Sequence, residues 1–443
     1  MPTVHEANLR YATHYVSIVQ QAYRLYSKGG EQTTLGFELF DREWTNIHRG
    51  YCWAVGCAAI DQVAAELCNS LSKTAVYFLD VRQHPQERRL WLESAIVSAR
   101  HVADRHLEAR HLCNLGSVVA RLGDFSAASE HYEQGLAVAR EVGDRRTEAG
   151  ALHNLARVAF AKGDALGAIQ RFEEVVPLFA DIGDRTGEFM ALGNLANAYA
   201  EAGKPRRGLD YGHRALALCR KIGDRADEAS RLADLGNIYL RVGEPAEALR
   251  YLEEALKCDR EISDRRGEAQ TLCSMASAKR ALGDTLGGIE LQKQALKIDR
   301  IIGNRQSECI LLGNLGVFHA EIGELHRACE YHQESLAIAR NIGDRRTEGR
   351  ALGNIGLVLL HLGNPREALP WIDQGISLAR ETADLADEGE SLYYKALALA
   401  KLDNRREAIA NAQTALGILI GIENPVADEV RSQLDEWQSR NGS

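Results

Sequence analysis

The histidines at positions 101, 106 and 111 come nearest, in type and spacing, to a metal-binding cluster. Imidazole nitrogens are common zinc ligands, but they must converge on one ion. A spacing of five residues turns successive side chains on an α-helix by about 140°, because each residue adds about 100°. We therefore expect exposed or cap-proximal histidines at these positions, and no metal.

Other motifs that carry chemistry are missing from the sequence. It contains no GxxxxGK[ST] phosphate loop, no HExxH, no GxSxG and no paired CxxC. The cysteines are odd in number and scattered, which predicts reduced thiols. We expect no enzymatic activity and no cofactor.

Asparagine and other polar residues recur at positions that could bind a partner. One column runs Asn114, Asn154, Asn194, Asp234, Ser274, Asn314, Asn354, Tyr394, and the next runs Ser117, Arg157, Asn197, Asn237, Ser277, Val317, Leu357, Leu397. An asparagine amide both donates and accepts hydrogen bonds, so a ladder of amides could hold an extended peptide by its backbone. The predicted partner-binding residues are Arg110, Asn114, Asn154, Arg157, Asn194, Asn197, Asp234, Asn237, Asn314, Asn354, Leu357 and Tyr394.

The asparagine column has a second interpretation, in which each amide bridges neighbouring helices and satisfies buried groups. Asparagine is a poor helix former, so its persistence in mid-helix needs one reason or the other. Both roles can coexist at Asn154 and Asn194. The change from polar residues to Val317, Leu357 and Leu397 also has two interpretations, namely an apolar anchor site for a ligand or a surface covered by the C-terminal helix.

A Gly-Asp turn signal recurs every twenty residues and marks the ends of the helices that carry these columns. It occurs at Gly143-Asp144 and Gly163-Asp164 and, two hundred residues after the first, at Gly343-Asp344. Glycine can end a helix with positive φ, and the following aspartate can cap the next helix. The full unit is forty residues long, and such a period indicates a solenoid of repeats.

Each unit reads as an antiparallel helical hairpin. In the specimen unit, Arg145 to Ala161 has an apolar stripe of helical period, and a second helix begins near Ala165. A leucine recurs on every first helix, and the small residue four positions later should let two helices approach closely. An Arg-x-x-Glu pattern, as at Arg145 and Glu148, is interpreted as stitching between repeats.

These residues resemble the tetratricopeptide repeat over residues 104 to about 424: small residues on both helices, and an aromatic such as Tyr199 near the end of the first. Leucine replaces the usual first-helix tryptophan, and arginine, as at Arg140, replaces the terminal proline. The forty-residue spacing and the Gly-Asn-Leu-Gly phrase are similar to the subclass in Leu-Gly-Asn (Pins-type) adaptors and bacterial signalling ATPases. The resemblance implies an all-α, right-handed superhelical solenoid that binds a peptide or protein in its concave groove.

The N-terminal region lacks the turn signal. Two helical patterns run from about Glu6 to Tyr26 and from Leu35 to Leu71, with a break at Lys28-Gly29-Gly30. The phrases at 11–15 and 40–47 resemble the start of the sensor arm of STAND-type ATPases, and Arg88 to Ala103 resembles the second helix of a degenerate repeat. The alternative function is thus the ligand-sensing arm of a STAND-like ATPase or transcription regulator without its nucleotide-binding module, either as a natural stand-alone arm or as an excised fragment.

The predicted organisation has four parts: a divergent helical region (1–84), a degenerate repeat helix (85–104), eight forty-residue repeats (105–424), and a capping helix with a tail (425–443). The capping helix is expected over Pro425 to Gln438, because terminal repeats need a polar outer face.

Composition narrows the class of partner. The net charge is −9, from 53 basic and 62 acidic residues with interleaved signs, so no basic stripe suits nucleic acid. The first residues lack a secretion pattern, and no stretch of eighteen apolar residues occurs, so no membrane association is expected and a cytoplasmic location fits best. We expect a non-catalytic interaction scaffold in signalling or regulation, with self-association through the repeat ends as a further alternative.

Overall fold

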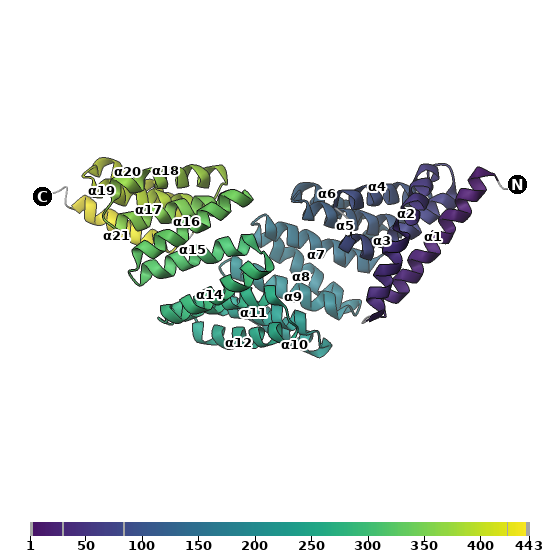
Figure 1. The fold of residues 1–443 in the computed structure, drawn as a ribbon, viewed down its shortest axis with the longest axis horizontal. Helices are drawn as coiled ribbons and strands as arrows, with labels where there is room; N and C mark the ends of the chain where they lie inside the picture. Colours follow the sequence, from purple (N-terminus) through teal and green to yellow (C-terminus); the bar gives the residue numbers. More distant parts are fainter. Residues whose placement is uncertain (1–2, 29–30, 83–84, 423, 440–443) are drawn as a thin grey trace. The chain divides into compact units, whose positions relative to one another are not determined.

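The structure of the protein is a computed structural model, which describes residues 3–28, 31–82, 85–422 and 424–439. These residues form 21 α-helices and no strand (Figure 1). The first ten are α1 (Val4–Tyr26), α2 (Glu31–Cys57), α3 (Gln62–Arg82), α4 (Pro85–His101), α5 (Arg105–Arg121), α6 (Phe125–Val142), α7 (Arg145–Ala161), α8 (Ala165–Asp181), α9 (Arg185–Glu201) and α10 (Pro205–Ile222). The others are α11 (Arg225–Val242), α12 (Pro245–Glu261), α13 (Arg265–Ala281), α14 (Thr285–Ile302), α15 (Arg305–Glu321), α16 (Leu325–Ile342), α17 (Arg345–His361), α18 (Pro365–Glu381), α19 (Leu385–Lys401), α20 (Arg405–Gly421) and α21 (Val426–Ser439).

The contacts between helices divide the chain into two compact units. Unit 1 is Met1–Ile222, with α1 to α10, and unit 2 is Gly223–Ser443, with α11 to α21. Within each unit, consecutive helices pack as antiparallel hairpins, and each hairpin packs on the next. The predicted all-α solenoid of helical hairpins is confirmed.

The turns between helices have the predicted structure, in which a glycine ends one helix and an aspartate caps the next. Gly143 has φ of 71°, in the left-handed region that glycine tolerates. Asp144 then accepts a hydrogen bond from the backbone N–H of Thr147 at 3.1 Å, which caps α7. Where the signal lacks glycine, the left-handed conformation persists, at Ala103, Ser263, Ala383 and Asp403.

The odd-numbered helices of the repeats form the inner layer of each unit. α5 contacts α7 and α7 contacts α9 in unit 1, and α11–α13, α15–α17 and α17–α19 do the same in unit 2. Among the second helices of the repeats in the described residues, α6 to α20, no two are in comparable contact. The first helices of successive repeats are therefore closer together than the second helices, and we call the surface that they share the inner face.

The small residue on each first helix permits close approach, as predicted. A Cβ added at Gly356 would lie 2.3 Å from Cγ1 of Ile372, and one added at Gly316 would lie 2.5 Å from Cε1 of His332. The second helix of the same repeat therefore fills the space that a side chain would need.

The N-terminal region differs from one sequence prediction. The single helix expected from Leu35 to Leu71 is wrong, because α2 ends at Cys57 and α3 begins at Gln62. Asp61 caps α3 by accepting from the backbone N–H of Val63 at 2.8 Å. Residues 29 and 30 of the predicted break lie outside the described residues. Residue 84, at the predicted boundary between the divergent region and the degenerate repeat helix, also lies outside them.

At the other end, α21 packs against α20. Val430, Leu434 and Trp437 of α21 are buried against the last repeat. None of the helices in the described part of the chain is both long and apolar enough to cross a membrane.

Candidate functional site

The asparagine column lies on the inner face, because each first helix begins at the same point of its repeat. Capping aspartates at Asp104, Asp144 and Asp184 start α5, α7 and α9 in the same register. Asn114, Asn154 and Asn194 therefore occupy equivalent positions and are all half-buried.

Two members of the column bridge to the preceding repeat. Nδ2 of Asn194 lies 2.9 Å from Nε2 of His153. In unit 2, Nδ2 of Asn314 donates to Sγ of Cys273 at 3.6 Å. In both pairs the partner precedes the asparagine by 41 residues, so the bridging interpretation holds at these two positions.

Other members of the column keep their amides open. The side chains of Asn114, Asn154 and Asn354 make no hydrogen bond to any described residue. Asn154 and Asn354 each line a pocket on the inner face. These are the amides available to a ligand.

The remaining predicted residues are divided between exposed and paired positions. Arg110, Arg157 and Asn237 are exposed, and Asn197 and Leu357 are half-buried. Two are engaged within their own helix: Asp234 forms an ion pair with Arg231 at 3.0 Å, and the hydroxyl of Tyr394 lies 3.5 Å from Oε2 of Glu390.

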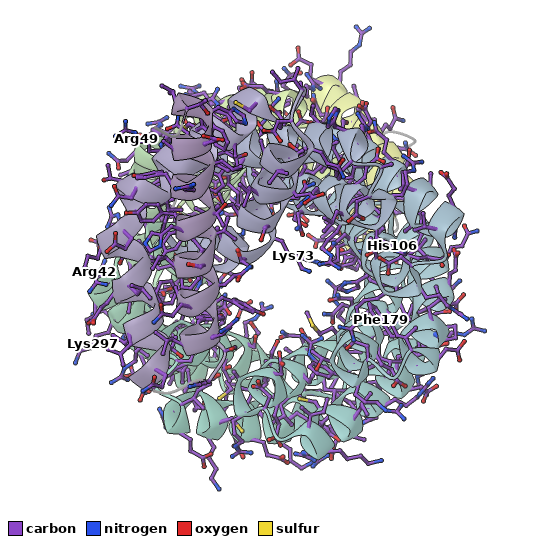
Figure 2. All side chains as sticks on the ribbon, turned by 90° about the vertical axis from the view of Figure 1, so that its right-hand side faces the viewer. Arg42, Arg49, Lys73, His106, Phe179 and Lys297 are labelled. Carbon is purple, nitrogen blue, oxygen red and sulfur yellow. The ribbon has the colours of Figure 1, made fainter. Side chains whose placement is uncertain are left out.

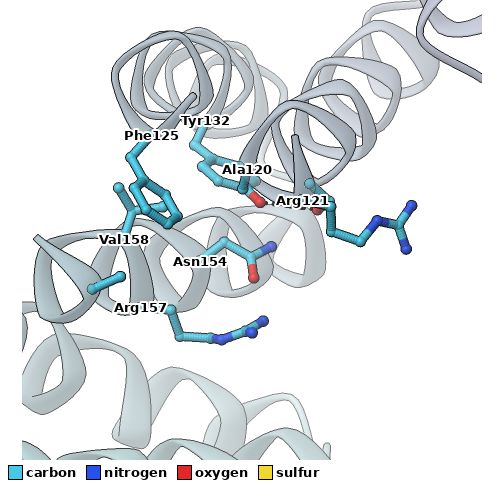
Figure 3. Close-up of a pocket in the computed structure, with 9 residues that line it drawn as sticks. Ala120, Arg121, Phe125, Tyr132, Asn154, Arg157 and Val158 are labelled. Atoms are coloured by element: carbon cyan, nitrogen blue, oxygen red, sulfur yellow. Dashed lines mark hydrogen bonds between the residues drawn. The ribbon is translucent and has the colours of Figure 1, made fainter. Parts of the chain in front are cut away.

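A pocket of about 410 Å³ lies between α5, α6 and α7 in unit 1 (Figure 3). The side chains of Arg121 and Arg157 extend on either side of Asn154. Phe125, Val158 and Tyr132 supply less polar walls, and the hydroxyl of Tyr132 donates to Oγ of Ser117 at 3.0 Å. We call this the arginine pocket.

The charges of Arg121 and Arg157 act on two buried groups, Arg88 and His153. Arg88, only 5% exposed, has its pKa lowered to about 10 by burial and by the charge of Arg121. Burial also lowers the pKa of His153 to about 4, and the charge of Arg157 acts in the same direction. Lys73 of α3 points toward the inner side of unit 1, whereas Arg42 and Arg49 of α2 project outward (Figure 2).

A second pocket, of about 470 Å³, lies between α15, α16 and α17 in unit 2. Its walls are mostly apolar and include Val317, Leu325 and Leu357, with Asn354 between them. We call this the leucine pocket. His332 lines it and is 1% exposed, and burial lowers the pKa of this histidine to about 4.

A third, more polar cleft of about 580 Å³ runs along α11, α13 and α15. It includes Asp234 and Asn237 from the predicted columns. Asp259, also in its lining, is 4% exposed and accepts from the hydroxyl of Thr271 at 2.8 Å. Burial raises the pKa of this aspartate.

The three histidines that resemble a metal cluster differ in environment. The expectation of exposed or cap-proximal histidines is confirmed at His101 and His106, which are exposed, and is wrong at His111, which lies inside α5 and is 1% exposed. Burial lowers the pKa of His111 to about 4. The described residues contain no group of three His, Cys, Asp or Glu side chains placed to hold a metal ion.

Comparison with protein families decides what kind of repeat this is. The sequence model of the tetratricopeptide repeat matches residues 107–181, 147–221, 187–261, 228–301 and 306–381, which together are more than half of the chain. The chain belongs to the tetratricopeptide repeat family.

Solved tetratricopeptide structures share the fold. A Signal Transduction ATPase with Numerous Domains (STAND) protein with a tetratricopeptide repeat sensor, from Pyrococcus horikoshii, has a TM-score of 0.57 and 18% identity over 85% of this chain; the chain spans 57% of that protein. Aspartyl phosphate phosphatase F from Bacillus subtilis has a TM-score of 0.55 and 15% identity, covering 83% of this chain and 91% of that one.

A Rap protein complexed with Competence and Sporulation Factor gives similar values, with a TM-score of 0.54, 16% identity, and coverage of 84% of this chain and 96% of that one. No curated protein matches the sequence.

The tetratricopeptide repeats are joined by ion pairs that explain the arginine in place of proline. Arg300 at the end of α14 donates to Glu308 of α15 at 2.8 Å, and Arg305 donates to the same carboxylate at 2.5 Å. The same two-arginine arrangement surrounds Glu268 and Glu348. The Arg-x-x-Glu pattern therefore joins neighbouring repeats, as the sequence predicted.

The C-terminal helix, α21, covers part of the apolar surface that the sequence predicts for the last tetratricopeptide repeats. The hydroxyl of Tyr393 lies 3.0 Å from Oε1 of Glu429 on α21. Leu357 and Val317, in contrast, line the leucine pocket. The covering interpretation therefore holds at Tyr393, and the anchor-site interpretation stays a prediction for Val317 and Leu357.

Proposed function

We propose that the protein is a non-catalytic scaffold that binds a peptide or protein partner on the inner face of its repeats. The observation that carries the proposal is the open amide of Asn154 in the arginine pocket and that of Asn354 in the leucine pocket. An amide half-buried in a pocket and without an internal partner can donate to and accept from a peptide backbone.

The remaining partner-binding residues enter the proposal according to their surroundings. Arg110, Asn114, Arg157, Asn197, Asn237 and Leu357 contact the partner directly. Asn194 and Asn314, bonded to the preceding repeat, hold the register of the inner face. The interleaved charges and net charge of −9 favour a protein over nucleic acid, and nine thiols without disulfides suit the cytoplasm.

The test uses a phage-displayed library of random 12-residue peptides selected on the full chain. The affinity of a selected peptide is measured by fluorescence anisotropy for Asn154→Ala and Asn354→Ala. Each lost amide should weaken binding by roughly fivefold, since a net hydrogen bond is worth about 1 kcal/mol.

The matched control is Gln134→Ala, which removes an exposed amide from α6, a second helix of a repeat. Equal affinities for Asn154→Ala, Asn354→Ala and this control would contradict the proposal, as would a library that yields no binding peptide.

A second candidate function is the ligand-sensing arm of a STAND-like regulator. The fold shared with the tetratricopeptide-sensor STAND protein supports it, and the chain spans 57% of that protein. A signalling role would follow from a separate ATPase module. Measuring ATP hydrolysis by that module with and without this chain tests the idea, and an unchanged rate would argue against it.

A further inference from the structure

A basic side chain contacts the capping aspartate of the next repeat at two places in the chain. In unit 2, Nε of Arg346 donates to Oδ2 of Asp384, the residue that caps α19. In unit 1, Nδ1 of His106 lies 3.6 Å from Oδ2 of Asp144, which caps α7. In both pairs the basic residue precedes the aspartate by 38 positions and is the second residue of the preceding first helix.

No basic side chain of the described residues forms an ion pair with Asp264. The residue 38 positions before it is Ala226, the second residue of α11. Ala226 lines the cleft along α11, α13 and α15, which we call the polar cleft. Asp264 caps α13 by accepting from the backbone N–H groups of Arg266 and Gly267, both at 3.0 Å, and its carboxylate has no cationic partner among the described residues. Alanine therefore leaves open the place that an arginine fills three repeats later.

A second carboxylate approaches the same point, and it is buried. Oδ1 of Asp259 and Oδ2 of Asp264 lie 2.6 and 2.8 Å from the position that a Cβ on Gly267 would occupy. Asp259 is 4% exposed and lines the polar cleft. Its Oδ2 accepts from the hydroxyl of Thr271, whereas its Oδ1 makes no hydrogen bond or ion pair with any described residue. The glycine thus lets two carboxylate oxygens meet without a cation between them.

A carboxylate is unusual at the position of Asp259. Six equivalent residues of other repeats are buried and uncharged: Ala139, Phe179, Cys219, Ala339, Ala379 and Leu419. The remaining one, Asp299, has no exposed surface and is out of reach of a ligand. Burial raises the pKa of Asp259, and the charges of Asp264 and Glu268 act in the same direction. A buried charge is costly unless it is paired, so a cation entering the cleft would relieve this repulsion.

The other charged residues of the polar cleft do not supply that cation. Asp234 forms an ion pair with Arg231 at 3.0 Å. Arg266 lines the cleft, is exposed and forms no ion pair with any described residue. The residue 38 positions after Arg266 is Asn304, a neutral cap, which explains why this arginine has no carboxylate to contact. The unpaired negative charge therefore lies at the two aspartates that meet over the glycine.

We infer that the polar cleft is the specificity site for a basic side chain, arginine or lysine, of the peptide partner, held by the carboxylates of Asp259 and Asp264. Guanidinium groups bind carboxylates with short charge-assisted hydrogen bonds. Asn237 of the polar columns lines the same cleft, so a peptide on the inner face reaches both. The net charge of −9 also favours a basic partner. This assignment rests on the proposed function and names the partner as a peptide with a basic residue.

The experiment selects the 12-residue phage library on the full chain and then compares two variants of the cleft. Ala226→Arg supplies an internal cation to Asp264, as Arg346 does in its own repeat. Asp264→Asn removes the charge and keeps the cap, because Asn304 caps α15 in the next repeat. Each variant therefore has a precedent elsewhere in the chain.

The matched controls make the same changes outside the cleft. Ala246→Arg introduces an arginine at an exposed alanine, the second residue of α12. Asp164→Asn changes an exposed aspartate that caps α8 in unit 1. Urea unfolding of every variant separates lost binding from lost folding. Ala226→Arg should unfold at a urea concentration no lower than that of the wild type, because the new guanidinium pairs with a carboxylate that has no cationic partner.

The wild-type chain should enrich peptides with one fixed arginine or lysine. A selected arginine peptide, followed by fluorescence anisotropy, should bind Ala226→Arg and Asp264→Asn about tenfold more weakly than the wild type. The same peptide with citrulline in place of arginine keeps its shape and loses its charge. It should bind the wild type and both variants with the same low affinity, and the two controls should behave as the wild type.

The outcomes separate this inference from the proposed function. Peptides that depend on Asn154 and Asn354 but carry no fixed basic residue would overturn the assignment and leave the proposed function standing. Equal affinities for the arginine and citrulline peptides, or unchanged affinities in Ala226→Arg and Asp264→Asn, would also overturn it. Basic peptides that respond to both cleft variants but not to Asn154→Ala or Asn354→Ala would support the assignment and contradict the role of the two amides. Failure to select any peptide would overturn both.

Discussion

His153 of α7 and Asn194 of α9 are joined across two repeats, with Nε2 of the imidazole 2.9 Å from Nδ2 of the amide. An amide nitrogen only donates, so Nε2 is the acceptor and the neutral ring carries its proton on Nδ1. His153 is 8% exposed and its pKa is lowered to about 4, which keeps the ring neutral near pH 7. The pair therefore links the first helices of adjacent repeats, and the amide nitrogen of Asn194 is already hydrogen-bonded within the protein.

This pair predicts different consequences for two asparagines of the same column. Asn194→Ala should lower the free energy of unfolding by about 1 kcal/mol, because a buried imidazole nitrogen loses its partner. Asn154→Ala should change it by less than about 0.5 kcal/mol, since no internal hydrogen bond is lost. Urea unfolding followed by circular dichroism measures both. Equal losses would mean that the two asparagines share one role.

Stability should fall on acidification through the buried histidines. The pKa values of His111, His153 and His332 are each lowered to about 4, against about 6.5 for an unfolded histidine. Between pH 6.5 and 4 the unfolded chain therefore binds more protons than the folded one. The free energy of unfolding then falls as pH falls, by at most roughly 1.4 kcal/mol per pH unit for each histidine.

The variant His332→Gln isolates one of these contributions. Gln292 fills the equivalent position one repeat earlier with no exposed surface, so glutamine has a precedent there. The urea midpoint of this variant should change less between pH 7 and pH 5 than that of the wild type. His326→Gln, at an exposed histidine, serves as control. An undiminished pH dependence in His332→Gln would contradict the prediction.

The helical hairpins could be predicted from the sequence, because their period, capping residues and small residues are local features that recur in every repeat. The bounds of α7, Arg145–Ala161, agree with the specimen helix expected from the apolar stripe. The break at 58–61 was missed because a single aspartate, Asp61, caps α3 in a region without repeats to compare.

The division of the asparagine column could not be predicted in the same way. The bridged amides contact the residue 41 positions earlier, which is His153 for Asn194 and Cys273 for Asn314, but Asn154 stays open although Cys113 lies 41 positions before it. Columns show which residues share a face, and they do not show which side chains meet across repeats.

The carboxylates between repeats should contribute to stability according to burial and number of partners. Glu308 is 3% exposed and receives Arg300 and Arg305, whereas Glu188, half-buried, receives Arg185 at 2.7 Å. Glu308→Gln should cost about 1 to 2 kcal/mol, reduced from a fully buried pair because both arginines are half-exposed.

Glu188→Gln should cost less than about 1 kcal/mol in the same urea experiment. Both losses should shrink in 1 M salt, with the smaller relative change at Glu308 because buried charges are screened less. A larger loss at Glu188 than at Glu308 would refute this ranking.

Replacing a non-glycine residue that has the left-handed conformation by glycine should stabilise the protein. Ala383 has φ of 53°, which costs an L-residue about 1 to 2 kcal/mol. Ala383→Gly removes this strain but adds roughly 0.5 to 1 kcal/mol of chain entropy to the unfolded state, so a net gain in stability of about 0.5 to 1 kcal/mol is expected.

The reverse change, Gly343→Ala, should lower the stability by a similar amount. A Cβ at Gly343 meets nothing within 4 Å, so its effect comes from the backbone alone. Thermal unfolding of both variants should shift in opposite directions, and a shift in the same direction would show that the conformation at 383 carries no strain.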